Sequence, residues 1–347
     1  MFCVIGNSPS SGSTLLSDLL DSTDYGVCGP ELNILSNTNL YKDFQKYSAA
    51  PFLPSASSSL YKVMNSINTS RLFNYALDEQ EFMSLLHETD SAYDFLIRFG
   101  LRFSQFRGKD KAVWFEKTPE NINCAQLFLD SFPEAYFIHI VRNPIHVARS
   151  LLHNRHFPLA ISLFAWLFDV SHLSGVRSDK LITVYYEDLV HGPYEVVSKI
   201  LSTITGETIC PEVVREGYEK NYYRKSVSKK IKTWGISEYG LIGNANKKID
   251  DVAFLSDFKS ALNYRISDCW HEKYSVPSLS YWDAIKEHGY EEDVLQMLNG
   301  VYSTHSIELT YGDRIILIKK NLKEIYLNHK YNICLNPFVF LDSDGEY

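Results

Sequence analysis

The chain has 347 residues, of which 45% are apolar and 22% charged, and its formal net charge is −8 at pH 7. This apolar content supports a sizeable core and excludes a disordered chain, while the length fits one large α/β domain or two domains. The acidic balance argues against binding to nucleic acid or to an anionic membrane surface.

The cysteines indicate the compartment. Six of them are scattered over the chain, at positions 3, 28, 124, 210, 269 and 334, without a C-x-x-C pair. This pattern favours buried thiols in a reducing compartment over a disulfide framework or a zinc site.

Pro9 and Gly12 interrupt the first apolar stretch, which is unlike a signal peptide, and the apolar stretch 157–168 is too short to span a bilayer. We therefore expect a cytoplasmic protein with no metal site.

The first turn of the chain has the residue pattern of an anion-binding loop. The segment 2–16 is predicted to be an apolar strand that runs through a turn of small residues into a helix, where leucines recur at helical spacing. Free backbone N–H groups at such a turn and helix start form a cradle for an anion. A nucleotide-hydrolysing P-loop needs G-x-x-x-x-G-K-[ST], but Ser13 stands at the lysine position here and the glycines are one residue too far apart. The loop therefore suits a phosphate better than a nucleoside triphosphate with magnesium.

Further strands are predicted in chain order. Buried-type strands at 112–116, 135–141 and 181–186 are each followed by a helical pattern. Strands that alternate with helices predict an α/β fold, here a P-loop-type parallel β-sheet flanked by helices. Ligands of such sheets bind at the carboxyl ends of the strands, which is where the polar motifs of this chain fall.

The domain organisation follows from the same pattern. We expect a core over residues 1–250, with a helical insertion at 33–111 over the acceptor site and helices at 79–87 and 93–106. Residues 251–347 are predicted to be a C-terminal extension of unknown role that packs on the core.

Five motifs together resemble one family. Residues 8–16 (S-P-S-S-G-S-T-L-L) resemble the 5′-phosphosulfate loop, P-[RK]-S-G-[TS]-T-x-L, of sulfotransferases that use 3′-phosphoadenosine 5′-phosphosulfate (PAPS). Residues 27–31 (V-C-G-P-E) and 116–119 (E-K-T-P) look like the C-G-x-E and [EK]-K-x-P elements of the tyrosylprotein-sulfotransferase-like and bacterial branch. Residues 141–150 match R-[ND]-P-x(5)-S of the 3′-phosphate site, and residues 186–190 (Y-E-D-L-V) match Y-E-D-L.

The resemblance implies a set of residues that bind PAPS and its product PAP (3′-phosphoadenosine 5′-phosphate). Arg142 and Ser150 suit one phosphate by their own chemistry, a guanidinium and a hydroxyl near a helix start at a strand end. Ser10 departs from the family pattern, which carries Arg or Lys there. The implied cofactor-binding residues are Ser10, Ser11, Gly12, Ser13, Thr14, Arg142, Ser150, Tyr186 and Lys229.

Three residues are candidates for the chemistry. Glu31 is the expected general base, because a carboxylate of pKa about 4.3 is ionised at neutral pH and can accept a proton. Lys117 is expected to neutralise the oxygen that leaves the sulfur. Ser228 and Lys229 resemble the later S-[KR] pair that touches the cofactor, with a solvated basic run as the open alternative.

The sequence thus predicts in-line transfer of a sulfuryl group from PAPS to a hydroxyl or amine, with release of PAP and without a metal. The expected acceptor is a small molecule, cationic or aromatic, such as a natural-product alcohol or a basic metabolite. Two alternatives stay open. A degenerate P-loop nucleotide kinase would depend on magnesium, and a non-catalytic PAP-binding sensor would bind the nucleotide without turnover.

Overall fold

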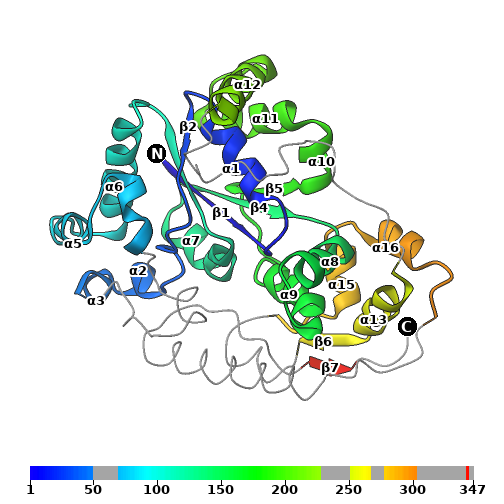
Figure 1. The fold of residues 1–347 in the computed structure, drawn as a ribbon. Coiled ribbons are helices and arrows are strands. Elements are labelled where there is room, and N and C mark those ends of the chain that lie inside the picture. Colours follow the sequence, from blue (N-terminus) through cyan, green and yellow to red (C-terminus); the bar gives the residue numbers. More distant parts are fainter. Residues whose placement is uncertain (50–68, 228–250, 267–276, 303–340, 344–347) are drawn as a thin grey trace.

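The computed structural model describes residues 1–49, 69–227, 251–266, 277–302 and 341–343. Its centre is a five-stranded sheet in the order β2-β3-β1-β4-β5, with every neighbouring pair parallel. The strands are β1 (Phe2–Asn7), β2 (Gly26–Cys28), β3 (Val113–Lys117), β4 (Tyr136–Val141) and β5 (Leu181–Tyr185). The predicted α/β fold with a parallel sheet flanked by helices is therefore confirmed (Figure 1).

The strands read as apolar runs because helices cover both faces of the sheet. Alternate residues of β4 show this: Ile138 and Ile140 pack with residues of α1 (Ser13–Asp21) and α11 (Pro193–Thr205). Phe137 points to the opposite face and joins the aromatic core under α6 (Ala92–Phe106) and α7 (Ala125–Ser131). The remaining helices of this part of the chain are η2 (Pro119–Cys124), α8 (Pro144–Asn154), α9 (Leu159–Ser171), α10 (Tyr186–His191) and α12 (Pro211–Val227).

Helices fill the described part of the predicted insertion. α5 (Glu79–His87) and α6 confirm the two helices expected there, and α2 (Asn39–Lys42), α3 (Phe44–Ala49) and the 3₁₀ helix η1 (Thr69–Tyr75) precede them. α5 begins with a capping box, in which Asp78 and Glu81 each bind the other's backbone N–H. The role of residues 33–111 as a cover of the acceptor site stays a prediction.

The described residues in the range 251–302 share a core with α8 and α9. α13 (Val252–Ala261), α15 (Tyr281–Glu287) and α16 (Glu291–Leu298) pack against α8 and α9 in one hydrophobic cluster, visible beside the sheet in Figure 1. β6 (Tyr264–Ile266) and β7 (Leu341–Ser343) form a small antiparallel pair. In the ranges that the structure describes, no helix is long and apolar enough to cross a membrane.

Candidate functional site

The turn between β1 and α1 has an unusual backbone. Ser10 and Gly12 both adopt the left-handed conformation, with φ of 69° and 97°. A Cβ atom on Gly12 would lie 2.3 Å from a ring carbon of Tyr186, so only glycine fits there. α1 begins directly after this glycine, as the N–H of Leu16 donates to the carbonyl of Gly12 at 3.1 Å.

This turn offers hydrogen-bond donors that the described residues do not use. The hydroxyls of Ser8 and Ser11 are buried and have no partner in the described part of the chain. The N-cap residue of α1 is Gly12, which has no side chain to cap the helix, and the first turn of α1 carries no acidic residue. Buried hydroxyls without a partner are costly, and an uncapped helix start attracts anions. The turn therefore fits a bound phosphate or sulfate group.

Two further strand ends meet this turn. Arg142, which directly follows β4, donates from Nη1 to the carbonyl oxygen of Ser10 at 3.0 Å. Its guanidinium lies 4.3 Å from the ring centroid of Tyr186, the first residue of α10 after β5. Burial lowers the pKa of Arg142 from its ordinary value. The cation predicted for the 3′-phosphate thus contacts the turn predicted for the 5′-phosphosulfate.

α8 holds the rest of the R-N-P-x(5)-S motif. Asn143 caps this helix, since its Oδ1 accepts the N–H of Ile145 at 3.0 Å, and Pro144 occupies the first turn. Ser150 lies within the helix, where its Oγ accepts a hydrogen bond from the amide of Asn154 at 3.3 Å.

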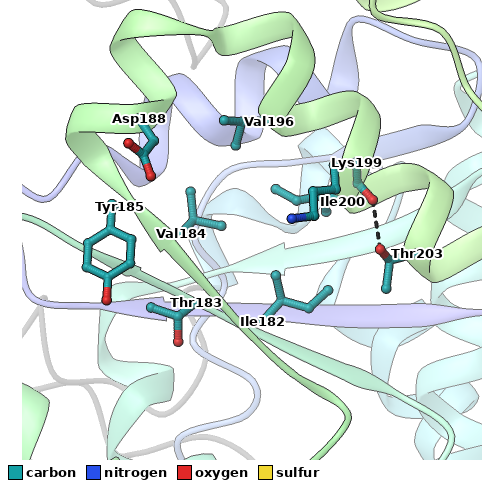
Figure 2. A pocket seen from close by; sticks show the side chains of 9 residues that line it. All are labelled: Ile182, Thr183, Val184, Tyr185, Asp188, Val196, Lys199, Ile200 and Thr203. Carbon is teal, nitrogen blue, oxygen red and sulfur yellow. Dashed lines mark hydrogen bonds between the residues drawn. The ribbon is translucent and has the colours of Figure 1, made fainter. Parts of the chain in front are cut away.

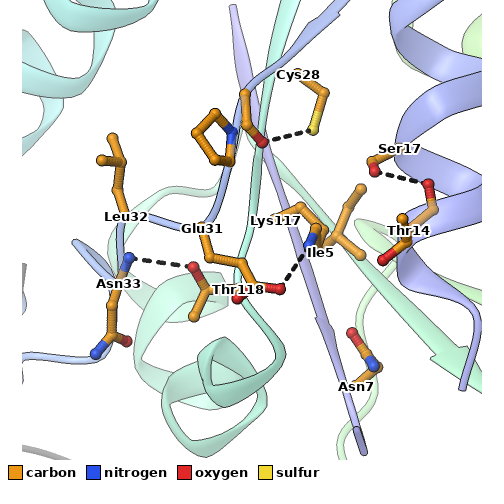
Figure 3. A network of polar contacts seen from close by, with 12 residues as sticks. Ile5, Asn7, Thr14, Ser17, Cys28, Glu31, Leu32, Asn33, Lys117 and Thr118 are labelled. Atoms are coloured by element: carbon orange, nitrogen blue, oxygen red, sulfur yellow. Dashed lines mark hydrogen bonds and ion pairs between the residues drawn. The ribbon is translucent and has the colours of Figure 1, made fainter. Parts of the chain in front are cut away.

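The structure brings the two predicted catalytic residues together. Lys117, the last residue of β3, donates from Nζ to Oε1 of Glu31 at 2.6 Å (Figure 3). The Lys117 side chain is 5% exposed, whereas that of Glu31 is 32% exposed. An accessible carboxylate is therefore held against a buried ammonium group at the carboxyl end of the sheet.

A second cation contacts the same carboxylate, and sequence reasoning missed it. Arg71 of η1 lies 3.3 Å from Oε2 of Glu31 and donates to the Glu31 carbonyl oxygen at 3.0 Å. Burial alone would raise the pKa of Glu31, but the ion pairs with Lys117 and Arg71 outweigh it and lower the pKa below the ordinary value. Arg71 belongs to no motif, so no sequence signal pointed to it.

The neighbours of Lys117 fix the chain segment that carries Glu31. Glu116 accepts the N–H of Leu32 at 3.3 Å. Oγ1 of Thr118 accepts the N–H of Asn33 at 3.1 Å, as Figure 3 shows. Thr118 also donates to Glu116 at 2.7 Å. Burial raises the pKa of Glu116. The E-K-T-P element therefore has two tasks: Lys117 pairs with Glu31, and the residues on either side hold the backbone beyond it.

A comparison with known protein families identifies the family of this chain. The model of the sulfotransferase family matches residues 3–207, more than half of the chain. The chain belongs to the sulfotransferase family. This assignment supports a sulfotransfer activity in general. No curated protein matches this sulfotransferase significantly.

Solved sulfotransferase structures are similar to it at low identity. The sulfotransferase domain of the Synechococcus PCC 7002 olefin synthase is 22% identical, with a TM-score of 0.43 over 62% of this chain and 76% of that one. The sulfotransferase domain from the curacin biosynthetic pathway is 15% identical, with a TM-score of 0.43 over 92% of this chain and 96% of that domain. Sulfotransferase STF1 from Mycobacterium tuberculosis H37Rv is 15% identical, with a TM-score of 0.36 over 63% of this chain and 71% of that one.

Four more of the expected site residues remain to be placed. Ser228 and Lys229 lie outside the described residues, so their roles stay predictions. Of the residues in the loop motif, Ser13 is buried at the start of α1 and Thr14 is exposed. No group of three or more potential metal ligands occurs within the described ranges.

A separate pocket lies at β5, the strand at one end of the sheet, beneath α11 (Figure 2). None of the predicted site residues lines it. Its walls are Ile182, Thr183, Val184, Tyr185, Asp188, Val196, Lys199, Ile200 and Thr203.

Proposed function

We propose that this sulfotransferase uses PAPS as the donor, transfers the sulfuryl group to a hydroxyl or amine of a small molecule, and releases PAP. The observation that carries the proposal is the 3.0 Å contact between Arg142 and the Ser10 carbonyl. This contact supports the proposal because it brings the motifs expected for the two phosphate groups together at the carboxyl ends of β1, β4 and β5.

The fit of the donor is supported by the groups that are present. The hydroxyls of Ser8 and Ser11, which have no partner among the described residues, and the start of α1 after Gly12 suit the 5′-phosphosulfate end. Arg142, with Ser150 on the same helix-bearing segment, suits the 3′-phosphate. When bound, PAPS supplies the sulfuryl group for transfer.

Glu31 and Lys117 divide the chemistry between them. Glu31 accepts the proton of the acceptor hydroxyl while the bond from the acceptor oxygen to sulfur forms. The bond between sulfur and the bridging phosphate oxygen breaks, and the Lys117 ammonium stabilises the negative charge on that oxygen. The 2.6 Å separation of the two side chains lets both reach one reacting centre. Glu31 then returns its proton to solvent.

The local charges bear on the acceptor. The sequence favoured a cationic or an aromatic molecule, and Glu31 is already paired with two cations, Lys117 and Arg71. A cationic acceptor would meet repulsion from both, so the aromatic class fits better. A cytoplasmic location belongs to the same proposal, supported by the buried free thiols of Cys3, Cys28 and Cys124.

The test is a metabolite screen. The purified protein is incubated with PAPS and pooled small molecules, and mass spectrometry follows the gain of SO₃ together with PAP release. A product that forms only with PAPS supports the proposal. Tight PAP binding without turnover of any acceptor would favour the sensor instead, and absence of PAP binding would exclude PAPS as the donor.

A further inference from the structure

One contact links residues beyond 250 to the predicted donor site. Tyr290, which directly precedes α16, is 4% exposed and donates from its hydroxyl to Oε2 of Glu187 at 2.8 Å. Its ring packs edge-on against Tyr185, with centroids 6.0 Å apart. The packing and the hydrogen bond are thus separate features of the same side chain.

The other oxygen of Glu187 holds the segment that follows β4. Oε1 accepts the backbone N–H of Asn143 at 3.1 Å. Asn143 stands directly after Arg142, and the residue before Glu187 is Tyr186, whose ring lies under the Arg142 guanidinium. Residues 186–187 therefore hold both the side chain of Arg142 and the peptide group next to it.

We propose that Tyr290 is a positioning residue of the donor site, which orients Glu187 and through it the Arg142–Asn143 segment. This inference rests on the proposed function. It gives the region beyond 250 a task in nucleotide binding that no motif of that region indicated.

The chemistry of the contact suits this task. Burial and the neighbouring Glu187 carboxylate raise the pKa of Tyr290, so its hydroxyl stays protonated and remains a donor. Hydrogen bonds to an ionised acceptor are stronger than neutral ones. Without the hydroxyl, the Glu187 carboxylate loses one of the two hydrogen bonds that it accepts from described residues and can turn away from Asn143.

The experiment compares two tyrosines of the same core. Tyr290→Phe keeps the ring and removes the hydroxyl. Tyr281→Phe is the matched control, because Tyr281 is fully buried in α15 and its hydroxyl donates to the Leu163 carbonyl at 2.8 Å, away from Glu187. Both variants lose a tyrosine hydrogen bond of 2.8 Å, and thermal melting without ligand measures the loss of stability in each.

PAP affinity, measured by calorimetry, distinguishes Tyr290→Phe from Tyr281→Phe. We expect Tyr290→Phe to raise the Kd of PAP by about 2- to 30-fold, the usual size of such coupling, and Tyr281→Phe to leave it unchanged. In turnover assays the KM for PAPS should rise more than kcat falls. Glu187→Gln tests the contact from its other end, and its effect on the Kd should not add to that of Tyr290→Phe.

The outcomes distinguish the inference from the function on which it rests. If the wild type binds PAP and Tyr290→Phe binds it equally well, the positioning role is wrong while the proposed function stands. An equal rise of the Kd in both tyrosine variants would mean general loosening of the core and would also overturn it. A wild type that does not bind PAP would overturn both.

Discussion

The ammonium nitrogen of Lys117 lies 2.6 Å from Oε1 of Glu31, although 86 positions separate the two residues in the chain. The contact forms because β2 and β3 are parallel neighbours, so the chain leaving β2 passes the end of β3. Glu31 also receives Arg71, which makes it a carboxylate between two cations. The first two predictions concern this group.

Glu31→Gln should lower kcat by roughly 10²- to 10⁴-fold, because the amide keeps the shape of the side chain but cannot accept the proton of the acceptor. The Kd of PAP should stay near the wild-type value. Steady-state kinetics and calorimetry measure the two quantities. Glu81→Gln, at an ion pair with Arg102 on the surface of α5, is the control. A near-normal kcat where chemistry limits the rate would show that another residue is the base.

The pH dependence should report the pKa of Glu31. In the proposed mechanism Glu31 must be ionised to accept a proton. Its pKa lies below the ordinary value, so kcat/KM should fall only when the pH drops through that lowered pKa. Arg71→Gln removes one of the cations that favour the charged form. The acid limb of the profile should therefore move to higher pH. A limb at the same pH in both proteins would contradict the role of Arg71.

Arg142→Ala should weaken PAP binding by roughly 10- to 100-fold, since a phosphate would lose a charge-assisted hydrogen bond. Calorimetry measures this loss directly. Arg98→Ala serves as the control, because it removes the same charge from a surface pair with Asp94 on α6. Equal PAP affinity in wild type and Arg142→Ala would remove Arg142 from the donor site.

Thr118→Val tests the support of the segment after Glu31. Valine has nearly the same shape, but it leaves the buried N–H of Asn33 without its acceptor, which costs about 1–3 kcal/mol. We expect a lower melting temperature and a lower kcat with little change in PAP affinity. Thr118→Ser keeps the hydroxyl and should restore most of the melting temperature and most of kcat. If the serine variant behaves like the valine variant, packing of the methyl group and not the hydroxyl is what matters.

Turnover should not depend on a divalent metal. The expectation comes from the first loop, where Ser13 replaces the lysine that a triphosphate-binding loop with magnesium needs. Rates of SO₃ transfer with and without EDTA measure it. Loss of activity with EDTA and its recovery with Mg²⁺ would revive the nucleotide kinase.

Much of the fold was predictable because its signals are local. Strands at 112–116, 135–141 and 181–186 are apolar runs that end in polar motifs, and the structure has β3, β4 and β5 there within one residue at each end. β2 was not predicted as a strand, because three residues are too few to show a pattern. It forms through its pairing with β3, which only the folded chain supplies.

The same division holds for the candidate site. The sequence by itself determined which motifs stand at strand ends, because parallel strands bring their carboxyl ends to one edge of the sheet. Only the tertiary structure decided which residues contact them. Arg71 donates to Glu31, Arg142 donates to the Ser10 carbonyl, and Tyr290 donates to Glu187. These contacts join residues 40 to 132 positions apart, a separation that periodicity and motif spacing do not encode. Side-chain packing across the folded chain sets them, so they follow from the fold and not from any local pattern.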